Sequence, residues 1–349
     1  MSAIRHRAVV GAGTLLGAFA VCCPAVLAGP DLAFGIPVGV HPDPFFATST
    51  PSRTAVALFQ DDPYAGTTVM QVEHHSGIGV LTVLPGMVNR LSYSPTGSRL
   101  LAHHRIGGDP DDPVMVSLLN DTGEVVWTKQ DARPFRFSNE GQRVYAVKRD
   151  RENLAKLEMF DLDGATVTSL SLNNELFDAV VDDQAKRAVL AVHHTITAFD
   201  WFPQLSLVWS FDLSQDDPPV EGLEPLGSQK ILVRLAMGRF KVIDWNGTTF
   251  YGYDPPFLAG MDPERSVEQY ERYRPYYAPE EDAIYLYNGT SDALALSLDD
   301  YSVSELPGVN TDSVGFKISR HIFGNRLVLV KDDEIRVRQV GLVGAEVPD

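Results

Sequence analysis

The stretch from Leu91 to Gln130 constrains the fold more than any other part of the chain, because it divides into four short apolar runs separated by turns. Pro95-Thr96-Gly97 ends the first run, since proline presets φ and glycine permits a positive φ. The loop Gly107–Pro113 ends the second run, and Asn120-Asp121-Thr122-Gly123 separates the third from the fourth. Four strands in about 40 residues is the length of one β-propeller blade.

The same pattern recurs along the chain at intervals of about 40 to 45 residues, with one longer gap before the sixth repeat. The runs either alternate apolar and polar residues or are wholly apolar, as expected of strands that are buried between sheets. The repeats begin near Phe45, Leu91, Phe135, Phe177, Val220, Tyr276 and Val314. We therefore predict an all-β fold, a seven-bladed β-propeller with four-stranded antiparallel blades, which forms a single domain over residues 29–349.

Two segments depart from this repeat. The last repeat contains three clear strands, so we expect Phe34–Val40 to pair as its outermost strand and close the ring, with Gly341–Val347 as the alternative. An insertion at about 255–273 begins with Asp262-Pro263-Glu264, which places a capping residue, a proline and an acid where a helix starts. We predict a short helix that ends near Tyr273.

The N-terminal residues have the features of a secretory signal. Arg5 and Arg7 precede an uncharged, mostly apolar run from Ala8 to Val21, and Val26-Leu27-Ala28 offers small residues for cleavage before Gly29. We expect residues 1–28 to be removed and the protein to be periplasmic or secreted. Cys22 and Cys23 fall within this segment, so lipidation at one of them is the alternative, and the cleaved chain has no cysteine.

The charge of the chain limits its partners. The formal charge of the 349 residues is −17, and removal of residues 1–28 takes away two arginines and no acids, which brings it to −19. Nucleic acids and anionic lipid surfaces both require a basic surface, so neither is an expected partner. No later run of apolar residues is long enough for a membrane span. We expect a monomer that binds a protein or a small molecule.

Two turn motifs resemble those of known families. Ser94-Pro95-Thr96-Gly97-Ser98 is similar to the Ser-Pro-Asp-Gly-Lys turn of WD-like blades, and Thr122-Gly123-Glu124 followed by Trp127 resembles the end of a quinoprotein-like (PQQ-like) repeat. Trp209 repeats that tryptophan in a later repeat. The resemblance implies a bacterial β-propeller and carries no catalytic residue. Enzymes of the quinone-dependent type commonly have a calcium site and a vicinal cysteine pair, which the cleaved chain lacks, so we expect no quinone cofactor.

Three histidine doublets are the most conspicuous candidates for chemistry. They are His74-His75, His103-His104 and His193-His194. Neighbours in a strand point to opposite sides of the sheet, so at most one member of each doublet can face a shared site. The predicted strands place the last two doublets near one face of the ring and the first near the other, which argues against a cluster of all three. We expect one packed and one solvated ring in each doublet.

Acidic pairs in the loops between second and third strands form the other candidate site. Carboxylates of this kind suit a divalent cation, although their spacing matches no calcium loop, and acids on both faces of the ring are also consistent with simple solvation. The insertion near Tyr270 would lie over the same face. The predicted ligand-binding residues are Asp61, Asp62, Asp109, Asp111, Asp112, His103, Arg105, His194 and Tyr270. We predict no metal site and no resident cofactor.

These features favour a binding or scaffolding module over an enzyme. The chain contains no Gly-x-Ser-x-Gly, no phosphate-binding glycine loop and no His-Glu-x-x-His. The alternative is an enzyme on the same scaffold, either a lactonase-type hydrolase or an oxidoreductase. Such an enzyme would use His103, Arg105 or His194 near the mouth of the ring.

Overall fold

The computed structural model describes most of the chain between residues 32 and 339. The described ranges are 32–35, 40–50, 52–60, 66–73, 77–107, 109, 111–131, 133–149, 155–172, 178–192, 194–202, 205–214, 217–253, 274–278, 281–287, 293–305, 321–323, 326–331 and 334–339. The predicted signal (1–28), the predicted helix in the insertion (255–273) and the alternative closing segment (341–347) lie outside them. Within these ranges, no helix is long and apolar enough to cross a membrane.

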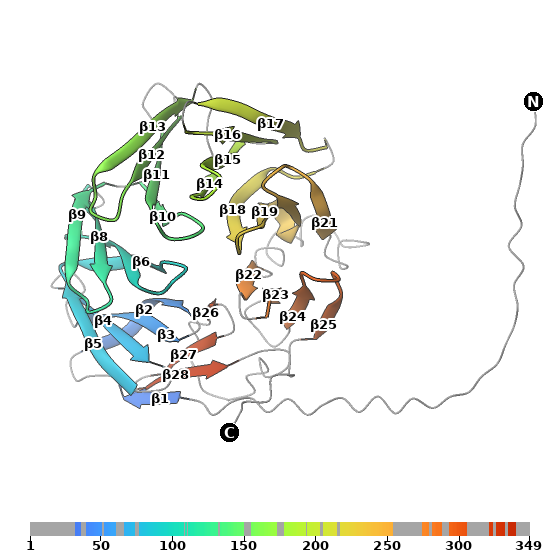
Figure 1. Cartoon of the computed structure of the whole chain (residues 1–349). Helices are drawn as coiled ribbons and strands as arrows, with labels where there is room; N and C mark the ends of the chain where they lie inside the picture. The colour runs from blue at the N-terminus through green and yellow to red at the C-terminus, as the bar shows by residue number, and fades with distance from the viewer. Residues whose placement is uncertain are drawn as a thin grey trace, which may run out of the picture.

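The first three blades are each built from four consecutive antiparallel strands (Figure 1). Blade 1 comprises β2 (Val40–Ser49), β3 (Arg53–Gln60), β4 (Thr67–Glu73) and β5 (Gly77–Leu84). Blade 2 comprises β6 (Met87–Tyr93), β7 (Arg99–Arg105), β8 (Val114–Asn120) and β9 (Val125–Gln130). Blade 3 comprises β10 (Phe135–Phe137), β11 (Val144–Arg149), β12 (Ala155–Phe160) and β13 (Thr166–Leu172).

The next three blades continue the ring in the same order. Blade 4 comprises β14 (Asp178–Asp182), β15 (Arg187–Val192), β16 (Thr195–Asp200) and β17 (Ser206–Asp212). Blade 5 comprises β18 (Val220–Leu226), β19 (Lys230–Leu235), β20 (Phe240–Asp244) and β21 (Thr249–Tyr253), with a 3-10 turn, η1 (Ala236–Gly238), after β19. Blade 6 comprises β22 (Arg274–Ala278), β23 (Ala283–Tyr287), β24 (Ala293–Ser297) and β25 (Val303–Glu305).

The remaining sheet joins the two ends of the chain. β26 (His321–Phe323), β27 (Arg326–Lys331) and β28 (Glu334–Gln339) are completed by β1 (Leu32–Gly35), which pairs antiparallel with β28 at the outer edge. The prediction that an N-terminal strand closes the ring is confirmed, although this strand lies slightly before the expected Phe34–Val40. The innermost strand was expected at Val314–Ile318, and the structure places it at β26.

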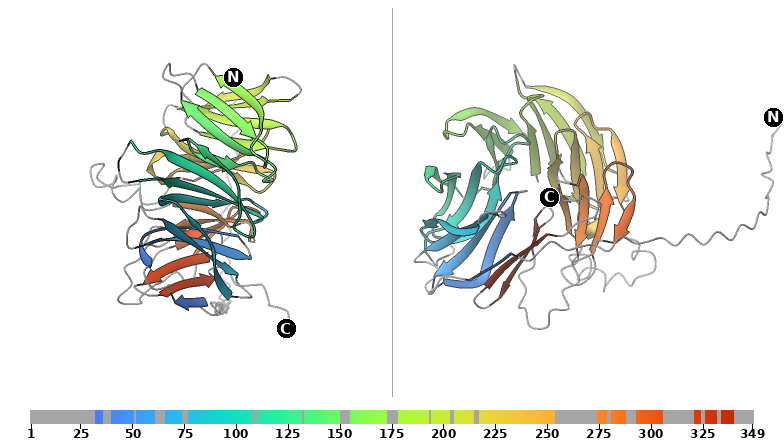
Figure 2. Two further views of the ribbon diagram at one scale, coloured as in Figure 1. Left: turned by 90° about the vertical axis from the view of Figure 1, so that its left-hand side faces the viewer. Right: turned by 60° about the horizontal axis from the view of Figure 1, so that its bottom comes forward.

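The prediction of an all-β propeller with four-stranded antiparallel blades is confirmed. Of the seven predicted repeats, six are continuous blades of four consecutive strands, and the last is the composite sheet that contains β1. The first strand of each blade lies nearest the axis of the ring, and the fourth lies at the outside. Figure 2 shows the strands crossing the thickness of the ring, so the connections between them lie on two opposite faces.

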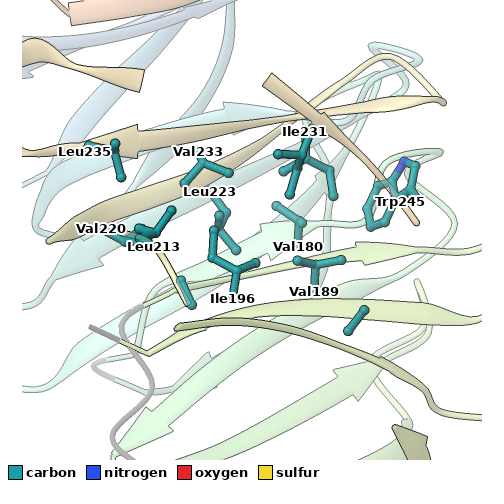
Figure 3. Close-up of a cluster of buried hydrophobic side chains, with 13 residues drawn as sticks. Val180, Val189, Ile196, Leu213, Val220, Leu223, Ile231, Val233, Leu235 and Trp245 are labelled. Atoms are coloured by element: carbon teal, nitrogen blue, oxygen red, sulfur yellow. The ribbon is translucent and has the colours of Figure 1, made fainter. Parts of the chain in front are cut away.

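The apolar core is divided into layers between neighbouring blades. Ile231 and Val233 of β19 pack with Val180 and Val189 of blade 4 (Figure 3), whereas Leu232, the residue between them, belongs to a cluster with Ile284 of blade 6. Alternate side chains of one strand therefore contact opposite neighbours, which explains why strands such as Ile231-Leu232-Val233 are wholly apolar. Similar clusters lie between blades 1 and 2, 2 and 3, and 3 and 4.

The turns between third and fourth strands fasten one blade to the next. Asn120, Asp161 and Asp244 occupy the same position in three blades, and each side-chain oxygen accepts the backbone N–H groups two and four residues later. Gly164 and Gly247 end two of these turns with φ of 86° and 85°. A Cβ atom on either glycine would come within 2.9 Å of a tryptophan of the preceding blade.

Those tryptophans are the ones that the sequence motif identified. Trp127 donates its indole N–H to the carbonyl of Leu162 at 3.2 Å, and Trp209 donates to the carbonyl of Trp245 at 2.9 Å. Each acceptor lies in or next to the glycine turn of the following blade. The motif is therefore a device for joining blades, because the tryptophan needs a turn without a side chain against which to pack.

We predict that Gly123→Ala destabilises the fold by about 1–3 kcal/mol or more, because two costs add. Gly123 has a φ of 84°, and a Cβ atom there would lie 2.1 Å from the backbone oxygen of Leu81 in blade 1. Gly252→Ala is the matched control, because nothing lies within 4 Å of a Cβ atom at that position. Urea unfolding of the two variants measures the difference, and equal stabilities would contradict this account of the turn.

Candidate functional site

Five ionisable side chains gather around the axis of the ring on four consecutive blades. We call them the axial cluster, and they are Arg90 of β6, Arg136 of β10, Asp178 of β14, Glu224 of β18 and Arg234 of β19. Their charges influence one another: the pKa of Arg90 responds to Arg136, Asp178 and Arg234, and the pKa of Glu224 responds to all four others. The cluster is thus one electrostatic unit.

Asp178 is the centre of this unit. Its buried carboxylate forms an ion pair with Arg136, with 2.7 Å between Nη1 and Oδ1. The carboxylate also accepts the backbone N–H groups of Ala179 at 2.9 Å and of Leu223 at 2.8 Å. Leu223 lies on β18, whose inner edge has no neighbouring strand, so Asp178 satisfies a backbone donor that would otherwise lack a partner.

Arg136 completes the tie between three blades. Its Nη1 atom donates to the carbonyl of Leu223 at 3.2 Å as well as to Asp178, so one guanidinium of blade 3 contacts blades 4 and 5. Burial by itself would lower the pKa of Arg136, but the charge of Asp178 and the neighbouring Tyr145 raise it above its ordinary value. Tyr145 is fully buried and donates its hydroxyl to the carbonyl of Ala179 at 2.8 Å.

The other two arginines are not neutralised in this way. Within the described part of the chain, neither Arg90 nor Arg234 forms an ion pair, and the buried Nε atom of Arg234 has no hydrogen-bond partner. Burial lowers the pKa of Arg90, and the positive charge of Arg136 lowers it further. Gly222 makes room for Arg234, because a Cβ atom at Gly222 would lie 2.5 Å from its Nη2 atom.

The cluster is positive in a strongly acidic protein. Three guanidinium groups face Asp178 and Glu224, and burial raises the pKa of Glu224, with the charge of Asp178 adding to this and the arginines opposing it. The sum is +1 if Glu224 is ionised and +2 if it is protonated, in a chain whose formal charge is −17. Arg136 is 24% exposed, so solvent reaches the cluster.

His103 is the predicted site residue that lies beside this cluster. It is the cross-strand partner of Arg90, and its Nε2 atom donates to the carbonyl of Phe135 in blade 3 at 3.3 Å. Its side chain is 5% exposed. Burial, and then the charge of Arg90, lower the pKa of His103 to about 4, so the ring is neutral at pH 7.

The neighbouring histidine corrects an expectation. His104 is also buried, and its Nδ1 atom donates to the carbonyl of Pro85 at 2.8 Å, while its Nε2 atom accepts a hydrogen bond from the hydroxyl of Ser117 at 2.9 Å. The expectation of one packed and one solvated ring is therefore wrong for this doublet. The cause is that both faces of a central blade strand are covered by neighbouring blades.

The predicted acidic residues in the β7–β8 loop mainly organise their own backbone. Asp112 accepts the N–H of Asp109 at 2.7 Å, Asp109 accepts the N–H of Asp111 at 3.1 Å, and Arg105 donates to the carbonyl of Asp109 at 3.3 Å. Gly107 has a φ of 105°, and a Cβ atom there would lie 2.2 Å from Asp112 Oδ2. The loop thus brings together four of the predicted residues, Arg105, Asp109, Asp111 and Asp112.

The rest of the predicted set is not joined to this loop in the described residues. His194 is exposed in the β15–β16 turn of blade 4, where its carbonyl accepts the N–H of Leu213 at 2.7 Å. Asp61, Asp62 and Tyr270 lie outside the described residues, as do His74, His75 and His193. Over the described ranges, no group of three or more His, Cys, Asp or Glu residues is arranged to hold a metal ion.

The axial cluster was missed by the sequence analysis, although a signal for it exists. Arg136 stands between Phe135 and Phe137, and Asp178 directly precedes Ala179-Val180-Val181, so each is a charge next to apolar residues in the first strand of a repeat. In a propeller the first strand lies nearest the axis. Charged residues in the first strands of several repeats therefore lie close together at the axis. Comparing the first strands of the predicted repeats would have indicated this cluster.

We predict that His103→Gln flattens the dependence of stability on pH between about 6.5 and 4. In this window the unfolded chain binds a proton at residue 103 that the folded chain does not, so the wild type loses stability as pH falls. The loss from pH 7 to 4.5 is roughly 2–3 kcal/mol. Urea unfolding at the two pH values measures it. His194→Gln, at an exposed site, is the control, and identical profiles for all three proteins would contradict the prediction.

Comparison with known proteins shows the fold and nothing finer. No family model matches the chain, and no curated protein matches its sequence. A chain from a crystal structure of a mitotic checkpoint complex superimposes on it with a TM-score of 0.56 and 11% identity, over 96% of this chain and 99% of that one. In all, 1264 chains of solved structures match, so the fold by itself does not identify a function.

Proposed function

We propose that this chain is a β-propeller binding module whose ligand sits at the axis of the ring, on the axial cluster. The observation that carries the proposal is the pair Arg90 and Arg234, two charged side chains near the axis without an ion-pair partner among the described residues. Charged groups that lack a partner in a partly buried place cost stability. The apolar layers between the blades do not include them.

The arrangement of the cluster suits binding. Its side chains come from four blades, and the backbone beneath them is held by the strand ladders and by the Asp178 and Arg136 contacts across three blades. A ligand would meet a site that is already formed, which reduces the entropy lost on association. His103, the cross-strand partner of Arg90, is hydrogen-bonded to Phe135 and neutral at pH 7, so it adds no charge to the site.

We further propose that the module acts outside the cytoplasm. The support is the N-terminal sequence, with Arg5 and Arg7, an apolar run and a cleavage signal before Gly29. A chain cleaved there has no cysteine, and its acidity suits a soluble extracellular protein. We expect exported protein to begin at Gly29 and to melt at the same temperature with and without reductant. N-terminal sequencing that finds a modified Cys22 or Cys23 would place it on a membrane instead.

We predict that a fluorophore at the axis reports ligand binding. Asn89 is exposed and lies next to Arg90 on β6, so Asn89→Cys in a chain without Cys22 and Cys23 offers one thiol for an environment-sensitive dye. Titration with sugars, amino acids, short peptides, divalent metals, carboxylates and phosphates should give a saturable change with at least one class.

The matched control carries the dye on the outer strand of blade 3. Ser169→Cys places the thiol at an exposed position of β13, away from the axis. A ligand of the axial site changes the emission of the Asn89 dye and leaves the Ser169 dye unchanged. Equal changes at both positions, or no saturable change at Asn89 with any class, would count against a binding site at the axis.

A further inference from the structure

We propose that the axial cluster binds an anionic group, either a carboxylate or a phosphate, between the guanidinium groups of Arg90 and Arg234. This inference rests on the proposed function, since it names the chemistry of the ligand that the axial site would take. It follows from the charge, the hydrogen-bonding capacity and the accessibility of the cluster.

The charge cannot be balanced by the cluster's own acids. Three guanidinium groups stand against two carboxyl groups, and an arginine does not lose its proton in a protein. Asp178 is already engaged by Arg136 and by two backbone N–H groups. Glu224 accepts no hydrogen bond from a described residue, and its environment favours the neutral form. Among the described residues, at least one positive charge of the cluster is therefore left for a ligand.

The three arginines also differ in how many of their hydrogen-bond donors are used. Arg136 uses its Nη1 atom on Asp178 and on the carbonyl of Leu223. Arg90 and Arg234 each present a planar fork of donors that no described acceptor uses, and the Nε atom of Arg234 is buried without a partner. Such forks match the paired oxygens of carboxylates and phosphates and bind them through two parallel hydrogen bonds.

The absence of a side chain at Gly222 leaves the space that the guanidinium of Arg234 occupies. Gly222 lies opposite Arg234 in the pairing of β18 with β19, and a side chain at Gly222 would occupy the place of the Arg234 Nη2 atom. The same Cβ position is 3.1 Å from Asp178 Oδ2. The guanidinium of Arg234 therefore lies against the backbone of Gly222, close to Asp178.

The ligand is a small anion or a single anionic group of a larger molecule. A chain with a formal charge of −17 repels polyanions at long range, so the positive cluster can act only over a short distance, where the local charges outweigh the rest. Nucleic acid is excluded by the same reasoning. Binding should weaken with rising salt, because the contact is between charges that solvent reaches.

The test uses calorimetric titration of the whole protein with inorganic phosphate and, separately, with succinate. Binding of phosphate alone identifies the group as a phosphate, and binding of succinate alone identifies it as a carboxylate. We expect Arg90→Gln and Arg234→Gln each to lower the affinity for the anion at least about tenfold, the usual effect of losing a charged hydrogen-bond partner. Lys129→Gln, which removes one positive charge from outer strand β9, should change the affinity less than about twofold.

A second readout separates binding from folding. Burial and the repulsion from Arg136 and Arg234 disfavour the charge of Arg90 by more than Asp178 and Tyr145 favour it, so its pKa is lowered. Arg90→Gln should therefore melt at the same temperature as the wild type or higher when no anion is present. Phosphate or succinate should raise the melting temperature of the wild type and not that of the variant. A variant that melts lower and still gains stability from the anion would show that Arg90 is structural and would overturn the proposal.

Two further outcomes would also overturn it. If neither anion binds the wild type, or if Lys129→Gln weakens binding as much as the axial variants, the cluster is not an anion site. The proposed function fails separately: a saturable response of the Asn89 dye to a sugar, a peptide or a metal, without any response to anions, would keep the axial binding site and reject only the anion.

Discussion

The structure depends on apolar contact between blades, with a central strand such as β19 contributing to two layers at once. In β19, Ile231 and Val233 contact blade 4 while Leu232 contacts blade 6. Each apolar cluster of the described residues joins two neighbouring blades, so a blade gains its stability from its neighbours and closure of the ring supplies the last contact. The pairing of β1 with β28 provides that closure by joining the ends of the chain in one sheet.

A ring of sheets has unpaired strand edges at the outside and at the axis, and the two kinds of edge have different contacts. At the outside, the turns that end with Gly164 and Gly247 cover Trp127 and Trp209 of the preceding blade. At the axis, side chains satisfy the exposed backbone, as when Asp178 and Arg136 bind the N–H and the carbonyl of Leu223. Charges are thus needed at the axis for structure, which gives a binding site a place to develop.

The axial cluster exceeds this structural need. One ion pair, Arg136 with Asp178, already bonds to both the N–H and the carbonyl of Leu223 on β18. Arg90, Arg234 and Glu224 add charge that forms no ion pair among the described residues, and such charge is an unfavourable addition to a fold unless a ligand balances it. The excess, more than the presence of charge, is the reason that we propose a binding role for the axis.

The local sequence determined the strands and turns of this protein, because their signals act over a few residues. The Asn120–Gly123 turn and the apolar runs around it predicted β7, β8 and β9 to within one residue, whereas β6 begins at Met87, four residues before the predicted Leu91. The spare N-terminal strand predicted the closure. The inner strand of the last repeat was misplaced, since its residues carry no clear period. Only the tertiary structure decided that His103 and His104 are both buried, because the neighbouring blades cover them. It also created the axial cluster, since Arg136 and Leu223 are 87 residues apart and meet only when the blades surround a common axis.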